Sequence, residues 1–241
     1  MNVFISFSGS AREEFALKFL NFFNKYGLHG WYDQHELFLG DVLKKTIICD
    51  GIDRANYCIL IINKTYLSRK WPCEEAQLLY QKSKEQDNHI VFPILLDLSK
   101  EELKASNLDF LLEIKYQFLY TGDEIDSIGF QILNRIFHDI ASRECLPNLQ
   151  LATSFFARLT QSTNIDIFNA LAILNNFDET NYRYKSVFLI CLIRLFNNNP
   201  YEKLIMEMSY FLYDTKHITF DMYKIIESVF LICASLFSQP Q

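Results

Sequence analysis

Glycine is absent from this 241-residue chain after residue 129. All seven glycines lie at or before Gly129, so the residues beyond that position contain few turns that require a positive φ angle. Clusters of Asn, Asp and Thr separate the apolar stretches there, which is typical of the boundaries between helices. We therefore predict a first domain over residues 1–146 and an all-helical domain over residues 147–241, with Pro147 at the boundary.

The chain also lacks a surplus of basic charge and paired cysteines. A net charge of -6 argues against nucleic acid as a partner, because nucleic-acid-binding proteins usually carry a basic surplus or stripe. The six cysteines are scattered without a Cys-x-x-Cys pair. This pattern favours reduced core residues over disulfides or zinc ligands, and it favours the cytosol. The histidines are too dispersed for a metal site, so none is expected.

Long apolar runs are missing as well. The N-terminus has no basic region followed by an apolar core, so no secretory signal is expected. The most apolar later segment, residues 228–238, is shorter than the roughly 20 residues that a membrane span needs. We expect a cytoplasmic protein that does not cross a membrane.

The first half alternates short apolar runs with helical patterns. The predicted strands are residues 3–7, 28–33, 57–62, 89–96 and 118–120, and the predicted helices are residues 11–26, 41–53, 72–85 and 123–144. Gly27 is expected to end the first helix. Alternating strands and helices imply an α/β fold with a mostly parallel sheet covered on both faces. In such sheets, ligands bind at the carboxyl ends of the strands.

The second half is expected to form a helical bundle. Its predicted helices are residues 149–161, 165–176, 180–197, 201–213 and 220–237, with Thr163, Asp178 and Thr219 as N-caps. Phenylalanines recur along these helices and suit a bundle core. We hypothesise that residues 148–241 share surplus apolar surface with a second copy and so hold the protein in an oligomer. Sensing of a trigger ligand, or binding of a partner protein, is the alternative.

The chemistry is expected in the turn that follows residues 57–62. Pro72 suits the first position of a helix, which would place Glu74 and Glu75 in its first turn. Trp71 and Glu75 are four residues apart, so an indole could wall a site while a carboxylate faces the ligand. The alternative is that Glu74 and Glu75 only complement the positive end of the helix dipole.

Six pieces of the first half, in this order, resemble a TIR (Toll/interleukin-1 receptor) domain over roughly residues 1–144. They are residues 3–8, 30–33, 39–41 and 57–62, then Ser68 with residues 71–75, and finally residues 90–94. The resemblance implies a flavodoxin-like five-stranded parallel sheet flanked by helices. It does not extend to the all-α helical bundle domain expected to follow, which we assign to no family.

The resemblance also implies an activity. In TIR domains that are enzymes, the Glu of a Trp-x-x-x-Glu motif is essential for cleaving NAD⁺ between ribose and nicotinamide. Here the motif selects Glu75 as the catalytic residue, although Pro72 stands where many relatives have Cys. The chemistry is consistent with this, because nicotinamide departs neutral and one carboxylate facing the developing oxocarbenium ion suffices. NAD⁺ is then a substrate, and no cofactor is needed.

The expected substrate-binding residues surround that carboxylate. They are Phe7, Ser8, Gly9, Asp33 and Trp71. Small residues after the first strand let a ligand approach the backbone, and the N–H groups at the start of the following helix could receive a phosphate. Enzymatic relatives often have arginine near this position, whereas this chain has Ser8 and Gly9, with Arg12 one turn further on.

One loop is expected to mediate assembly. It contains His35, Leu37, Phe38, Leu39 and Gly40, and it resembles the TIR loop that in relatives packs against a neighbouring TIR domain and completes its active site. An apolar cluster within a polar loop is more expected of a contact surface than of a free loop. The alternative is that Leu37, Phe38 and Leu39 fold back onto their own core.

Three functions remain in competition. The first is an NAD⁺ nucleosidase, a hydrolase or ADP-ribosyl cyclase, which TIR assembly activates as an antiviral defence effector or signal producer. The second is a non-catalytic TIR adaptor, and the third is an enzyme like the nucleoside deoxyribosyltransferases. Trp71 and Glu75 favour the first function over the second, and the loop that ends at Gly40 favours a TIR domain over the third.

Overall fold

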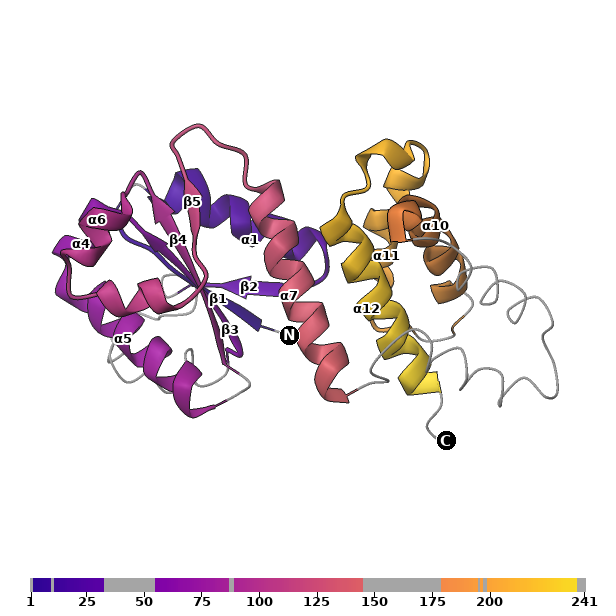
Figure 1. Cartoon of the computed structure of the whole chain (residues 1–241), viewed down its shortest axis with the longest axis horizontal. Coiled ribbons are helices and arrows are strands. Elements are labelled where there is room, and N and C mark those ends of the chain that lie inside the picture. The colour runs from indigo at the N-terminus through magenta and orange to yellow at the C-terminus, as the bar shows by residue number, and fades with distance from the viewer. Residues whose placement is uncertain are drawn as a thin grey trace, which may run out of the picture. The chain divides into compact units, whose positions relative to one another are not determined.

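The computed structural model describes residues 2–9, 11–32, 55–86, 89–144, 179–194, 196 and 199–237. The chain forms two compact units, residues 1–129 and 130–241, so the division falls within helix α7 (Asp126–Glu144; Figure 1). The predicted domain boundary between residues 146 and 147 lies outside the described residues and stays a prediction. Other predicted features also lie outside them: Asp33, His35, Leu37, Phe38, Leu39, Gly40, Thr163, Asp178 and the helices at residues 41–53, 149–161 and 165–176.

The first unit is built on a five-stranded parallel sheet with the order β2-β1-β3-β4-β5 (Figure 1). Every residue of the middle strand, β3, is buried, because both of its faces are covered, which explains its uninterrupted apolar sequence. The predicted parallel α/β sheet is confirmed. The strands are β1 (Asn2–Ser6), β2 (His29–Trp31), β3 (Tyr57–Ile62), β4 (Ile90–Leu96) and β5 (Gln117–Leu119).

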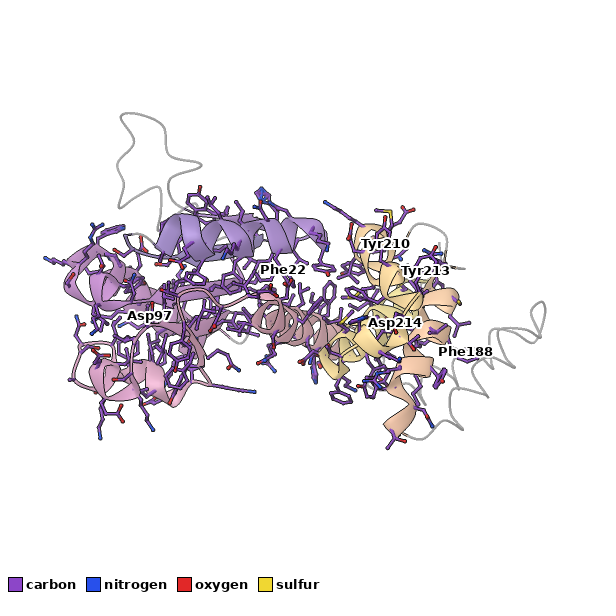
Figure 2. The ribbon with its side chains drawn as sticks, turned by 90° about the horizontal axis from the view of Figure 1, so that it is seen from above. Phe22, Asp97, Phe188, Tyr210, Tyr213 and Asp214 are labelled. Atoms are coloured by element: carbon purple, nitrogen blue, oxygen red, sulfur yellow. The ribbon has the colours of Figure 1, made fainter. Side chains whose placement is uncertain are left out.

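Helices cover both faces of this sheet, with α1 on one face and α5 on the other (Figures 1 and 2). The segment predicted as a single helix over residues 11–26 contains a π-helical turn, η1, before α1. Two short helices, α4 and α6, were not predicted. The helical elements of this unit are η1 (Arg12–Ala16), α1 (Leu17–Lys25), α4 (Lys64–Ser68), α5 (Lys70–Glu85), α6 (Lys100–Lys104), η3 (Asp109–Glu113) and the start of α7.

Gly27 lies just after the end of helix α1 and stops it, as predicted. Gly27 has a φ of +82°, a conformation that glycine adopts without steric cost. The N–H of Leu28 donates to the carbonyl of Phe23 at 2.9 Å, and the N–H of Gly27 donates to the carbonyl of Asn24 at 3.2 Å. These two bonds form a Schellman motif, which satisfies carbonyls at the end of the helix before β2 begins.

The second unit is helical among its described residues, as predicted. Its elements are η4 (Glu179–Asn181), α10 (Tyr182–Ile193), α11 (Glu202–Ser209), η5 (Tyr210–Leu212), η6 (Thr215–His217) and α12 (Phe220–Phe237). Helix α10 packs along α12. The N–H of Met222 donates to Thr219 Oγ1 at 3.3 Å, which confirms Thr219 as an N-cap.

Helix α7 contributes side chains to this second unit from Phe130 onward. Asn134 Nδ2 donates to Asp221 Oδ1 at 2.8 Å, and the rings of Phe137 and Tyr201 meet edge to face at 5.2 Å. On the surface of the unit, Tyr210 and Tyr213 are exposed (Figure 2). Within the part of the chain that the structure describes, no helix is long and apolar enough to span a membrane.

Candidate functional site

The candidate site lies at the carboxyl ends of β1 and β3. The chain runs from β1 to a neighbour on one side, β2, and then returns to β3 on the other side of β1. The connections that leave β1 and β3 therefore diverge, and in doubly wound sheets ligands bind in the crevice at this switch point. Here the first residues of those connections are Phe7, Ser8 and Gly9 after β1, and Asn63 after β3.

The pleat of β1 directs Ser6 toward α4 and α5. Phe4 and Leu60 belong to the core cluster that also contains residues of α4 and α5. Ser6 follows Phe4 by two residues and pairs with Leu60 of β3, so its side chain points to the same face of the sheet. A polar side chain therefore occupies the last β1 position on an otherwise apolar face.

Helix α5 begins earlier than predicted. It starts at Lys70, two residues before Pro72, and its first turn contains no acidic residue. The prediction that Glu74 and Glu75 lie in the first turn was therefore wrong. Proline is tolerated at the third helical position because the first four N–H groups have no partner within the helix. The helix dipole acts mainly on the first turn, so dipole complementation is a weaker explanation for Glu75.

Glu75 is buried, with only 4% of its surface exposed. Its neighbour Glu74 instead lies near Lys70 on the surface, with 3.7 Å between the charged atoms. Ser6 Oγ donates a hydrogen bond to Glu75 Oε2 at 2.8 Å. A buried carboxylate is costly unless hydrogen bonds compensate for lost hydration, and Ser6 supplies one such bond from a neighbouring element.

Tyr66 of α4 extends this arrangement. Its hydroxyl lies 2.9 Å from Ser6 Oγ, and its side chain is fully buried. Burial raises the pKa of Tyr66 well above its ordinary value, and the negative charge of Glu75 raises it further. The phenol therefore stays protonated at physiological pH.

Helix α4 places Tyr66 through its caps. Asn63 Oδ1 accepts a hydrogen bond from the N–H of Tyr66 at 2.8 Å, and Asn63 Nδ2 donates to the carbonyl of Ser8 at 3.3 Å. At the other end, the thiol of Cys73 donates to the Tyr66 carbonyl at 3.5 Å. The signal for α4 that sequence reasoning missed was Asn63, a favourable N-cap directly after a buried strand.

The described substrate-binding candidates have different surroundings. Phe7 is half-buried and meets Tyr32 edge to face at 5.4 Å. Ser8 is buried, and no hydrogen-bond partner for its Oγ occurs among the described residues. Gly9 is exposed with a φ of +67°, and an added Cβ would lie 3.2 Å from Thr65 Cγ2.

Trp71 is half-buried and packs against the core cluster on the α5 side. It lies about one helical turn before Glu75 on the same helix. The structure thus brings Ser6, Tyr66 and Glu75 into contact, whereas sequence reasoning had selected only Glu75. Substrate contact by Phe7, Ser8, Gly9 or Trp71 stays a prediction.

The described cysteines are reduced, and Cys73 contacts the site through its bond to the Tyr66 carbonyl. Cys58, Cys73, Cys191 and Cys233 are free thiols; of these Cys191 is exposed, although core positions were expected for most cysteines. Burial raises the pKa values of the Cys58 and Cys73 thiols. Across the described ranges, no cluster of three His, Cys, Asp or Glu side chains could hold a metal ion.

The first part of the chain is similar in sequence to known proteins. A family model described as TIR domain matches residues 3–131. The NAD(+) hydrolase TcpC of Escherichia coli O6:H1 (strain CFT073) is 31% identical over 100 residues, which are 42% of this chain and 32% of that protein. The 2' cyclic ADP-D-ribose synthase BtTIR of Bacteroides thetaiotaomicron is 30% identical over 101 residues, which are 42% of this chain and 34% of that protein.

A further relative comes from Methanobrevibacter olleyae and is named a probable 2' cyclic ADP-D-ribose synthase, TcpO. It is 31% identical over 103 residues, which are 43% of this chain and 29% of that protein. The chain thus spans about a third of the length of these curated relatives. Among solved structures, the TIR domains of the activated Roq1 resistosome match with a TM-score of 0.44 and 25% identity, over 56% of this chain and 98% of that one.

Proposed function

The chain belongs to the TIR domain family, and we propose that it is an NAD⁺ nucleosidase that cleaves the bond between nicotinamide and ribose. Relatives named NAD(+) hydrolase or cyclic ADP-ribose synthase support this substrate. The observation that carries the proposal is the position of Glu75: a buried carboxylate, held by Ser6, beside the carboxyl end of β1. We assign Glu75 the catalytic role.

The reaction requires little more than one oriented carboxylate. When the C–N bond breaks, its electron pair goes to the nicotinamide nitrogen, which becomes neutral, and positive charge develops on the ribose. Glu75 would stabilise that charge and bind ribose hydroxyls. A carboxylate has about four acceptor positions, and the bond from Ser6 occupies one of them. The low exposure of Glu75 would strengthen the attraction, because water screens it poorly there.

The nature of the product depends on what attacks the cation. Attack by water gives ADP-ribose, whereas attack by a group of the same molecule gives a cyclic isomer. One relative is named an NAD(+) hydrolase and another a 2' cyclic ADP-D-ribose synthase. We propose that Ser8 and Gly9 contact the substrate after β1, since Ser8 Oγ is buried without a partner among the described residues. Trp71 would form one wall of the site.

Chromatography of the products tests this proposal. Purified protein is incubated with NAD⁺ at several protein concentrations, and the nucleotides and nicotinamide are resolved over time. We expect nicotinamide to appear in a 1:1 ratio to the NAD⁺ consumed, together with ADP-ribose or a cyclic isomer. If the amount of NAD⁺ stayed unchanged at every protein concentration, the proposed NAD⁺ cleavage would be contradicted and a non-catalytic adaptor would be favoured.

We further propose that assembly activates the enzyme in the cytosol, where it acts as an antiviral defence effector or produces a signal. The free cysteines suit a reducing compartment, and the apolar residues Leu37, Phe38 and Leu39 suit a contact loop. Specific activity should therefore rise with protein concentration. A constant specific activity from a protein that remains monomeric throughout the assay would contradict activation by assembly.

The helical residues 148–241 would hold the oligomer together, with ligand sensing as the alternative. The second unit exposes several large apolar or aromatic side chains, including Tyr184, Met206, Tyr210 and Tyr213, which suits a surface shared with another copy. Light scattering of the full chain at tens of micromolar decides this point. A monomeric mass would exclude the oligomer and leave sensing or partner binding.

A further inference from the structure

We propose that Ser6 and Tyr66 are positioning residues that orient the Glu75 carboxylate through a chain of two hydroxyl groups. The proposal rests on the assignment of Glu75 as the catalytic residue. It is carried by two contacts between buried side chains: 2.9 Å between Tyr66 Oη and Ser6 Oγ, and 2.8 Å between Ser6 Oγ and Glu75 Oε2. The three residues come from β1, α4 and α5.

The number of available protons fixes which group donates in each of the two hydrogen bonds. A serine hydroxyl has a single proton to donate, and Ser6 donates it to Glu75. The contact between Ser6 and Tyr66 therefore requires the Tyr66 phenol to donate to Ser6 Oγ. Both hydrogen bonds are then donated in the direction of the Glu75 carboxylate.

The surrounding structure holds Tyr66 at a fixed place. The N–H of Tyr66 is bound by the Asn63 cap, and its carbonyl accepts the Cys73 thiol. Asn63 in turn binds the backbone at Ser8. Because Ser6 pairs with Leu60 within the sheet, both hydroxyls are fixed relative to the strands, and the carboxylate they hold is fixed with them.

This arrangement has two chemical consequences. Donation from Tyr66 polarises the Ser6 hydroxyl and makes it a stronger donor, because hydrogen bonds in a chain reinforce one another in a low-dielectric interior. The bond from Ser6 then favours the ionised form of Glu75 and one orientation of its carboxylate. The other titratable groups that act on Tyr66 are the thiols of Cys58 and Cys73, which remain neutral because burial raises their pKa values.

The first test compares two Tyr→Phe variants of the full chain. In Tyr66→Phe the phenol that donates to Ser6 is removed. In the control, Tyr80→Phe, a phenol is removed that donates at 2.5 Å to Glu113, a different carboxylate on the exposed side of the same unit. We expect kcat for NAD⁺ cleavage to fall roughly 10- to 100-fold in Tyr66→Phe with KM changed less than about threefold, because misorientation of a reacting group affects turnover more than binding.

The control should keep both constants within about twofold of the parent chain, because an exposed hydrogen bond contributes little to orientation elsewhere. Thermal unfolding of each variant gives the folded fraction used to correct kcat. The positioning role would be overturned if the corrected kcat of Tyr66→Phe equalled that of Tyr80→Phe. If Glu75→Gln were inactive in the same assay, the proposed function would still stand.

The second test does not depend on catalysis. The side-chain carboxyl carbons of glutamate are labelled with ¹³C, the Glu75 signal is assigned by its loss in Glu75→Gln, and its titration is followed by NMR. We expect the titration midpoint of Glu75 to move to higher pH in Ser6→Ala and, by less, in Tyr66→Phe, because donors to the charged form are lost. Tyr80→Phe should not move it.

The two tests separate the two claims. A Glu75 midpoint that moves in a protein without NAD⁺-cleaving activity supports the hydroxyl chain and contradicts the proposed function. A Glu75 midpoint that is the same in the parent chain, Ser6→Ala and Tyr66→Phe contradicts the hydroxyl chain, whatever the activity of the protein.

Discussion

Asn63 and Ser8 are linked across the switch point of the sheet: the Asn63 amide donates to the Ser8 carbonyl at 3.3 Å. The same side chain caps α4 through the N–H of Tyr66. One residue therefore joins the loop after β1 to the helix that carries the Tyr66 hydroxyl. Changes at Asn63 should affect both the stability of the first unit and the shape of the proposed substrate loop.

Two substitutions at Asn63 separate these effects. Asn63→Ala removes the cap and should lower the free energy of unfolding by about 1 kcal/mol. Asn63→Ser retains a good capping oxygen but has no amide to reach Ser8, so stability should change by only a few tenths of a kcal/mol while KM for NAD⁺ rises. Urea unfolding and steady-state kinetics measure both quantities. Equal stability of the two variants would contradict the capping role.

Gly129 of α7 is expected to resist replacement by alanine. An added Cβ would lie 2.6 Å from Phe22 Cε1. Phe22 is buried, and the ring centroids of Phe23 and Tyr26 lie 5.6 Å and 4.9 Å from that of Phe22, so the ring has little room to move. Gly129→Ala should therefore destabilise the protein by about 1–3 kcal/mol, despite the better helix propensity of alanine.

A double-mutant cycle with Phe22→Leu checks this reason for the loss. The smaller side chain makes room for the new Cβ, so the double variant should lose less free energy of unfolding than the sum of the two single losses. Additive losses would show that the contact between Gly129 and Phe22 is not what limits the size of residue 129.

His89 should make stability depend on pH. Burial lowers the pKa of His89, and nearby Lys82 lowers it further, although a backbone hydrogen bond at Ala55 acts in the opposite direction. In the unfolded chain the pKa is near the ordinary value of about 6.5. As the pH falls below that value, the unfolded state binds a proton before the folded state does, so stability decreases.

Urea unfolding at pH 7.5 and pH 5.5 measures this decrease. His89→Gln removes the titrating group, so the loss of stability between the two pH values should be smaller in the variant than in the parent chain. An identical loss in both chains would mean that His89 does not titrate differently on folding.

The sheet was predictable from sequence where its strands are buried on both faces. Residues 57–62 were predicted as a strand, and the structure has the same bounds, because a central strand of a parallel sheet is apolar throughout. Gly27 was also predicted correctly as the residue that stops the first helix, because its positive φ is a conformation that glycine adopts easily. The start of α5 was placed too late because Pro72 was assigned to the first helical position, whereas the third position also tolerates proline.

The site was predictable only in part. Glu75 follows Trp71 at a spacing that sequence alone reveals. Ser6, which donates to Glu75, lies 69 residues away along the chain, and Tyr66, which contacts Ser6, lies 9 residues from Glu75. Their meeting depends on the strand order, on the pairing of Ser6 with Leu60 and on the short helix α4. Asn63 is a local signal for α4, but the strand order and the pairing have none, so the sequence does not identify the hydroxyl pair.

Replacement of one glutamate at a time tests the central claim most directly. Glu75→Gln keeps the size of the side chain and an oxygen that can accept from Ser6, but it removes the negative charge that would stabilise the ribose cation. Glu74→Gln is the matched control, because Glu74 lies one residue away and its 3.7 Å ion pair with exposed Lys70 is of a kind that contributes little. Both variants are compared with the parent chain by NAD⁺ turnover under identical conditions.

We predict that Glu75→Gln lowers kcat for NAD⁺ cleavage by about a thousandfold or more, with the thermal unfolding temperature close to that of the parent chain, and that Glu74→Gln changes kcat by less than about twofold. If Glu75→Gln retains most of the parent turnover, Glu75 is not the catalytic carboxylate and the account is wrong.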